Sequence, residues 1–172
     1  ATTADRMFRR FDDIFETCGW RVITLKYGKR QREAFKKPGG QALEGWIDSC
    51  PNADFAALTY QGGAAWRARL HADLGAKAQT RKLIDSYDDE GLARLMTNLG
   101  GHCVETLIDA FDAAQDEVPT LFIAYTVKGH GLPLAGHKDN HSGMMNPSQM
   151  MQFRAGLGIA DGEIEAIFED YH

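Results

Sequence analysis

The sequence is poor in cysteine and has no long apolar run. Its three cysteines, Cys18, Cys50 and Cys103, lie far apart and form no CxxC pair, which argues against a disulfide framework. Each falls on an apolar helix face or at a helix start, so we expect reduced, buried thiols. No apolar run reaches the ~18 residues that a membrane-spanning helix needs, and residues 1–11 lack the layout of a signal peptide. These absences predict a cytoplasmic protein without a membrane partner.

Positive charge is also scarce, because 19 Lys and Arg residues stand against 24 Asp and Glu residues, for a net charge of −5. The short basic clusters at 29–32 and 36–37 are flanked by acidic residues, as is typical of solvated helix faces. We therefore expect no nucleic-acid partner. The apolar fraction of 44% is sufficient for a core, and 172 residues correspond to one domain or to part of a larger one.

Two helix–strand units frame the chain. Residues 4–18 carry apolar side chains at helical spacing, and Gly19 stands where a left-handed cap precedes a strand at 20–25. A second amphipathic helix at 103–117 leads into an apolar, β-rich strand at 120–127 that we expect to be buried. The side chains of this second helix that are expected to face inward are Val104, Leu107, Ile108 and Phe111.

Short helices are predicted between these units and after them. The segments 29–37 and 41–50 end at Pro-Gly and Pro-Asn breaks, and the segment 53–98 is divided by glycines and an Asp pair. Asn146 caps a further helix, and a last helix is expected at 161–168. Two apolar stripes within 53–98 predict core positions, namely Trp66, Leu70 and Leu74, and Leu92, Leu95, Met96 and Leu99.

Alternating helices and strands predict an α/β fold with a mostly parallel sheet and helices on both faces. Two strands cannot form such a sheet alone. Either further strands lie in the irregular middle of the chain or the rest of the sheet lies outside it; we favour the second and interpret residues 1–172 as a single, incomplete domain.

The strand at 120–127 opens into a polar loop at about 128–146, and this is the edge at which α/β sheets bind ligands. The candidate residues of the loop are Lys128, Gly129, His130, Gly131, His137 and His141. The last two histidines have the i,i+4 spacing of zinc ligands on a helix, but the surrounding Gly, Asp, Asn and Ser residues indicate a loop, and no third ligand is evident. We expect an active-site edge and no metal site in this segment.

The segment TVKGHGLPLAGHKDNHSGMMN resembles thiamine-diphosphate enzymes of the transketolase superfamily. In that family a strand ends in T-[IV]-K-G-x-G, and a histidine follows in a mobile loop over the cofactor. The likeness is closest to the homodimeric pyruvate dehydrogenase E1 component. Three further segments resemble that family in the same order, namely DRMFRRFDDIFETCGWRVITLKYG, NLGGH and RAGLGIADGEIEAI. The likeness spans nearly the whole chain, although the specific motifs lie within 98–146.

The resemblance implies a thiamine-diphosphate-binding fold, of which this chain is the latter part of the pyrophosphate-binding domain. The family's G-D-G motif, with the Asn that helps to hold magnesium, does not occur here, so thiamine diphosphate and Mg would both need residues outside this chain. The implied partners are a small-molecule 2-oxo acid, the remaining domains or second subunit of a homo-oligomer, and a lipoyl carrier domain. The fragment alone is expected to be inactive.

The resemblance also implies roles for the loop residues. Lys128 would stabilise the diphosphate or the substrate carboxylate, while Gly129 and Gly131 allow close approach of the backbone. His141 would donate a proton or hydrogen-bond the acyl group, because an imidazole titrates near neutral pH. His137 would orient His141 or contact the substrate.

Two more histidines and two departures from the family pattern complete this interpretation. His102 is expected to contact the domain's own backbone, and His130, at the variable position of K-G-x-G, is expected to pack or to make a peripheral contact. Cys103 stands where the family commonly has Asp, which removes a capping carboxylate. The segment 142–145 replaces a more basic stretch of the family, so this interpretation does not identify the acyl acceptor.

Three functions remain in view. The first is a segment of a thiamine-diphosphate-dependent 2-oxo acid (pyruvate) dehydrogenase E1, an oxidoreductase that performs decarboxylation with acyl transfer. The second is transketolase-type ketol transfer between sugar phosphates, for which the loop has no obvious Arg, Arg154 being the nearest. The third is a non-catalytic α/β assembly or regulatory module, which leaves Lys128 and the loop histidines unexplained.

Overall fold

The computed structural model describes the backbone of residues 6–159 and the side chains from residue 10 onward. The expected helix at 161–168 lies outside the described residues. In chain order the elements are α1 (Arg6–Thr17), β1 (Arg21–Leu25), α2 (Lys29–Phe35), α3 (Gly40–Ser49), α4 (Asn52–Gln61), α5 (Gly63–Leu74), α6 (Ala78–Asp85), α7 (Asp89–Met96), the 3₁₀ helix η1 (Gly100–His102), α8 (Val104–Asp112), β2 (Thr120–Ala124) and α9 (Pro147–Gly156).

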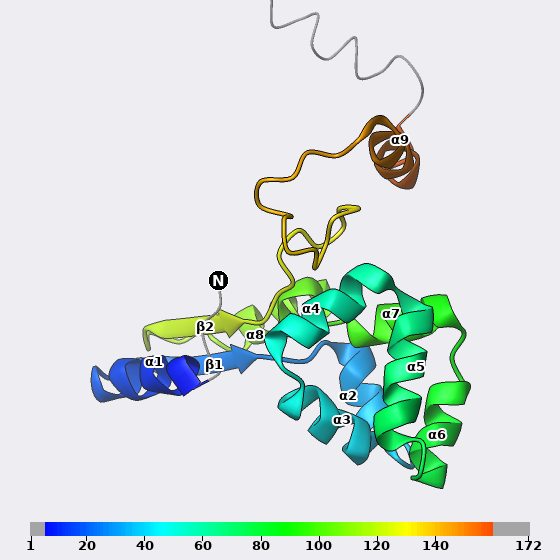
Figure 1. The fold of residues 1–172 in the computed structure, drawn as a ribbon. Helices are drawn as coiled ribbons and strands as arrows, with labels where there is room; N and C mark the ends of the chain where they lie inside the picture. The colour runs from blue at the N-terminus through cyan, green and yellow to red at the C-terminus, as the bar shows by residue number, and fades with distance from the viewer. Residues whose placement is uncertain (1–5, 160–172) are drawn as a thin grey trace, which may run out of the picture.

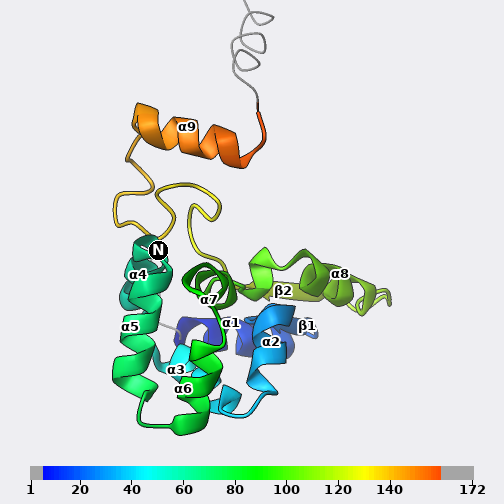
Figure 2. The same cartoon turned by 90° about the vertical axis from the view of Figure 1, so that its right-hand side faces the viewer.

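The two strands form a parallel pair, in register from Arg21↔Thr120 to Leu25↔Ala124. The helix α1 leads into β1 and α8 leads into β2, and the two helices lie on opposite faces of the pair (Figures 1 and 2). The helices α2–α7 form a separate cluster beside the sheet, and the candidate loop and α9 lie beyond the end of β2 (Figure 1). The structure thus confirms a mixed α/β fold with a parallel strand pair.

Strand β2 ends at Ala124, three residues earlier than the predicted strand, because the next residues bond to η1. The carbonyl of Tyr125 accepts a hydrogen bond from Gly101 N at 3.0 Å, and Val127 N donates to the imidazole of His102 at 2.7 Å. The residues of β2 are half-buried or exposed, not buried as predicted. The reason is that the described residues supply only two strands to this sheet.

The hydrophobic core lies among α2–α7. Both predicted apolar stripes are buried along their whole length, which confirms them as core. The Trp66 indole makes edge-on contacts with Trp46, at a ring-centroid distance of 6.0 Å, and with Phe55, at 5.0 Å. Aromatic pairs of this geometry add about 0.5–1.5 kcal/mol each to the gain from burial.

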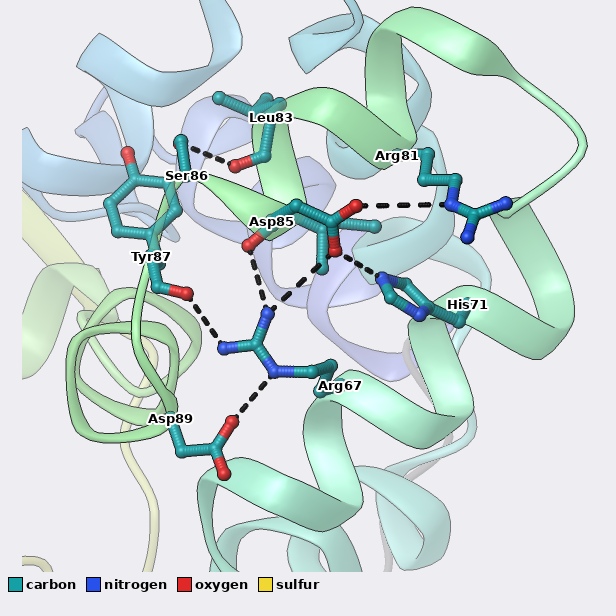
Figure 3. A network of polar contacts seen from close by, with 9 residues as sticks. Arg67, His71, Arg81, Leu83, Asp85, Ser86, Tyr87 and Asp89 are labelled. Atoms are coloured by element: carbon teal, nitrogen blue, oxygen red, sulfur yellow. Dashed lines mark hydrogen bonds and ion pairs between the residues drawn. The ribbon is translucent and has the colours of Figure 1, made fainter.

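Arg67 joins α5 to the turn between α6 and α7 (Figure 3). Its Nε donates to Asp89 Oδ1 at 2.7 Å, and its Nη2 donates to the Tyr87 carbonyl at 2.6 Å. Asp85 lies 3.9 Å from Arg67 Nη1 and 2.8 Å from Nε2 of His71, one turn further along α5. These polar contacts link α5 to the end of α6 and to the start of α7.

Helix α8 buries a different face from the one predicted. Thr106 and Ala110 are buried, whereas Val104, Ile108 and Phe111 are 67%, 52% and 53% exposed. The helix packs its small side chains against β1 and η1. The Phe111 ring contacts the Phe122 ring of β2, at a centroid distance of 4.7 Å, but the described residues leave more than half of this large apolar face exposed.

The scarce cysteines also differ in part from expectation. Cys50 and Cys103 are buried free thiols, but Cys18 is exposed. Cys18 lies in the turn after α1, where its N–H bonds back to the Ile14 and Phe15 carbonyls and no described element covers its side chain. Within the described part of the chain, no helix has both the length and the apolarity to cross a membrane.

Candidate functional site

Two glycines let η1 approach the carboxyl ends of both strands. Gly100 N donates to the carbonyl of Lys26, just after β1, and Gly101 N donates to the Tyr125 carbonyl, just after β2, both at 3.0 Å. A Cβ on Gly100 would overlap the Leu25 carbonyl, and one on Gly101 would lie 2.7 Å from the Tyr125 oxygen. This glycine pair therefore allows η1 to hydrogen-bond to the chain just after both strands, at the sheet edge where the candidate loop begins.

The side chain of His102 makes further contacts at the same sheet edge. Its Nε2 accepts the Val127 N–H at 2.7 Å, and its ring stacks on the ring of His130, with centroids 3.7 Å apart and planes 11° apart. Burial, with a smaller contribution from His130, lowers the pKa of His102 to about 4. The imidazole is therefore neutral at pH 7 and can act as an acceptor. The structure confirms the backbone contact expected for His102 and the packing expected for His130.

The candidate loop folds back on its own first residue. Asn140 Nδ2 donates to the Lys128 carbonyl at 2.5 Å, and Gly136 N donates to the same oxygen at 3.4 Å. His141 follows Asn140 directly in the chain. The loop closure therefore bonds the side chain of the residue before His141 to the backbone of Lys128.

The side chains of Lys128 and His141 are both exposed. Neither lines any of the four principal cavities formed by the described residues. Gly129 and Gly131 have φ angles of +74° and +83°, a left-handed conformation that favours glycine, and no atom lies within 4 Å of a Cβ placed on Gly131. The described residues thus place the cationic amine, the glycine turn and the distal imidazole in one open loop, without a shared cavity.

His137 packs onto helix α4. Its ring lies 4.6 Å from the ring of Tyr60, between centroids, and its Nδ1 accepts the Asp139 N–H at 3.2 Å. Lys138 lowers the pKa of Asp139, with smaller contributions from His137 and His141. The Asp139 carboxylate therefore interacts electrostatically with both histidines.

Asn140 and Asp139 were not among the residues singled out from the sequence. Asn in a glycine-rich loop is a signal for a side chain that bonds to nearby backbone, and this signal could have identified Asn140. Asp139 follows a lysine and an expected site histidine, but its interaction with both histidines depends on how the loop folds. Among the described residues, no group of three or more His, Cys, Asp or Glu side chains could hold a metal ion.

Comparison with known proteins gives a consistent picture. No protein-family model matches the chain. The chain is 25% identical over 169 residues to the pyruvate dehydrogenase E1 component of Escherichia coli (strain K12), a match that covers 94% of this chain and 18% of that protein. The match to the pyruvate dehydrogenase E1 component of Corynebacterium glutamicum has 26% identity over 172 residues and covers 93% of this chain and 18% of that protein.

A third relative is the pyruvate dehydrogenase E1 component of Buchnera aphidicola subsp. Acyrthosiphon pisum, which is 26% identical over 137 residues, or 78% of this chain and 15% of that protein. The chain therefore spans less than a fifth of the length of these relatives. Over most of its own length, it is similar to a limited part of pyruvate dehydrogenase E1 components.

Proposed function

We propose that this chain is a segment of a thiamine-diphosphate-dependent 2-oxo acid dehydrogenase E1, which decarboxylates pyruvate and transfers the acyl group. The observation that carries the proposal is the similarity to pyruvate dehydrogenase E1 components over 94% of the chain. The position of the candidate loop supports it, because the loop follows the carboxyl end of a parallel strand, where α/β folds bind ligands.

The described residues could form part of the site that holds the cofactor. The exposed amine of Lys128 and the left-handed turns at Gly129 and Gly131 offer a positive charge and accessible backbone to a diphosphate group. Magnesium would need donors other than the described residues, which form no metal-binding group. When bound, thiamine diphosphate supplies the electron sink for loss of CO₂ from a 2-oxo acid.

In this proposal Lys128 neutralises the diphosphate or the carboxylate of the 2-oxo acid. His141 supplies a proton to the reacting group or hydrogen-bonds the acyl oxygen. The hydrogen bond from Asn140 to the Lys128 carbonyl restrains the segment that carries His141 relative to the start of the loop. His137 fixes the loop on α4 through Tyr60 and so orients the His141 segment.

The proposal also needs other polypeptide to cover the loop and the sheet. The apolar face of α8, formed by Val104, Ile108 and Phe111, is more than half exposed. On the other face of the sheet, Phe11 and Ile14 of α1 are 42% and 57% exposed. Apolar faces of this kind mark contact surfaces, and we assign them to the remaining strands and domains of the enzyme or to its second subunit.

The test is an assay of the enzyme assembled from this chain and the polypeptide that completes its domain. We expect thiamine-diphosphate-dependent release of CO₂ from pyruvate with an artificial electron acceptor. Lys128→Ala should reduce kcat/KM about 10-fold or more, as loss of a contact to a charged group does. His141→Ala should reduce kcat about 100-fold, as loss of a general acid does.

The matched control is Lys82→Ala, which removes an exposed lysine of α6 and should leave both constants unchanged. Turnover of xylulose 5-phosphate in preference to pyruvate would instead support ketol transfer. An assembly that binds no thiamine diphosphate and turns over neither compound would support the non-catalytic module and overturn the proposal.

A further inference from the structure

Two hydrogen bonds from distant residues hold the backbone on either side of Lys128. The N–H of the preceding residue, Val127, donates to Nε2 of His102 at 2.7 Å. The carbonyl of Lys128 itself accepts a hydrogen bond from Asn140 Nδ2 at 2.5 Å. The backbone conformation limits the rotamers that a side chain can adopt, so these two bonds restrict the directions in which the Lys128 amine extends.

The sheet does not provide this restraint. Its last paired residues are Leu25 and Ala124, so the ladder ends three residues before Val127. Beyond that point the Val127 N–H has the imidazole of His102 as its partner. The position of the backbone just before Lys128 therefore depends on one side-chain acceptor.

The imidazole of His102 is itself held from two sides. The preceding residue, Gly101, donates its N–H to the Tyr125 carbonyl at 3.0 Å. On the other side the ring stacks on the His130 ring, with centroids 3.7 Å apart, and the His130 N–H donates to the Val127 carbonyl at 3.1 Å. These contacts orient the acceptor before a ligand binds, as is required of groups that support a site.

The state of the ring makes His102 unsuited to proton transfer. Burial, with a smaller contribution from His130, lowers the pKa of His102 to about 4, whereas a general acid or base works best with a pKa near the working pH. Its Nε2 is also occupied by the Val127 N–H. The hydrogen bond to Val127 is therefore the route by which His102 acts on the site.

We propose that His102 is a positioning residue, which accepts the Val127 N–H and thereby directs the amine of Lys128 toward the anionic group that this lysine binds. The proposal rests on the proposed function, in which that group is the diphosphate or the carboxylate of the 2-oxo acid. Since His102 acts through Lys128, removal of its acceptor should have little effect once the lysine amine is absent.

The test compares two replacements of His102 in the assembled enzyme. His102→Phe keeps a ring that can stack on His130 but has no acceptor for the Val127 N–H, whereas His102→Gln keeps an acceptor and loses the ring. We expect His102→Phe to reduce kcat/KM for pyruvate about 5-fold through misplacement of Lys128. His102→Gln should stay within about 2-fold of the parent, because an amide oxygen can accept the same hydrogen bond.

A double-mutant cycle with Lys128→Ala separates positioning from a general loss of structure. In the Lys128→Ala background, His102→Phe should reduce kcat/KM by less than about 2-fold, because residues that act as a unit are not additive. The matched control is His71→Phe, which removes a half-buried imidazole of α5 that lies 2.8 Å from Asp85. It should leave kcat/KM within about 2-fold of the parent value.

Hydrogen exchange of the Val127 amide gives a readout that does not depend on catalysis. Exchange should be about 10-fold faster in His102→Phe than in the parent assembly, because the amide loses its acceptor. In His102→Gln it should remain close to the parental rate. Mass spectrometry of the peptide that contains Val127 measures the difference.

Three results would overturn the positioning role and leave the proposed function intact. They are a loss of kcat/KM in His102→Gln as large as that in His102→Phe, an undiminished effect of His102→Phe in the Lys128→Ala background, and unchanged exchange of the Val127 amide in His102→Phe. Absence of pyruvate turnover in the parent assembly would instead overturn the proposed function, and the positioning role with it.

Discussion

The imidazole of His102 accepts the backbone N–H of Val127 at 2.7 Å, one residue before Lys128. A ring nitrogen can accept a hydrogen bond only while it is unprotonated. The path of the chain out of β2 therefore depends on the titration of one side chain. His130, stacked on His102 at 3.7 Å, adds repulsion whenever both rings are charged.

The first prediction is a loss of stability in acid that arises from His102. Its pKa of about 4 in the folded protein lies below the ordinary value of 6.5, so the unfolded chain binds more protons between these two pH values. The contribution of His102 to stability is therefore full above pH 6.5 and falls as the pH decreases toward 4. After allowance for the partial exposure of the ring, the loss should be about 2 kcal/mol.

Urea unfolding at pH 7.5 and at pH 4.5 measures this loss. His102→Gln keeps an acceptor but does not titrate, so its stability should fall about 2 kcal/mol less than that of the parent chain over the same interval. Equal losses in the parent and in His102→Gln would contradict the assignment.

The second prediction concerns the glycine pair at the sheet edge. A Cβ on Gly101 would lie 2.5 Å from Thr126 Cγ2 and 2.7 Å from the Tyr125 oxygen, so Gly101→Ala should destabilise the protein by about 1–3 kcal/mol through overpacking. Gly45 lies inside α3, and no atom lies within 4 Å of a Cβ placed there. Gly45→Ala should therefore stabilise the protein by about 0.5–1 kcal/mol. Thermal unfolding of both variants gives the comparison, and two shifts of the same sign would count against it.

The sequence was informative where local periodicity decides the structure. The stripe of Trp66 and Leu70 is buried as predicted because α5 is covered on that side by helices close in sequence. The two helix–strand units also formed, and their strands pair in parallel. Periodicity alone did not determine which face of α8 is covered, so Ile108 was expected inside and is 52% exposed.

The end of β2 and the shape of the candidate loop depend on contacts between distant residues. Val127 leaves the strand because His102, 25 residues earlier, takes its N–H. Lys128 and Asn140 are joined by a side-chain hydrogen bond across the loop. Neither contact has a periodic signal, and so the sequence predicted the members of the candidate loop but not its closure.

The third prediction tests that closure. Asn140→Asp has almost the same shape but cannot donate to the Lys128 carbonyl, so it loses about 1 kcal/mol of local stability. Local opening should then become about 5-fold more frequent, and trypsin should cleave after the exposed Lys138 about 5-fold faster. Ser142→Ala, an exposed substitution in the same loop, is the control and should leave the rate unchanged. An unchanged rate in Asn140→Asp would show that the bond does not restrain the loop.

The fourth prediction concerns the polar network around Arg67 (Figure 3). Arg67 is 25% exposed in its side chain and binds the Asp89 carboxylate and the Tyr87 carbonyl. Arg67→Ala leaves both acceptors without this donor and should reduce the free energy of unfolding by about 2–3 kcal/mol. The matched control is Arg94→Ala in α7, whose partner Glu90 is 76% exposed, and its cost should be below about 0.5 kcal/mol.

Salt separates these two arginines further. A surface pair such as Arg94–Glu90 is screened by 1 M NaCl, whereas the Arg67 contact to a backbone carbonyl is a hydrogen bond that persists. We therefore expect most of the Arg67→Ala penalty to remain in urea unfolding at 1 M NaCl. A penalty that disappears in salt would reduce Arg67 to a surface ion pair and would remove the polar link between α5 and the turn before α7.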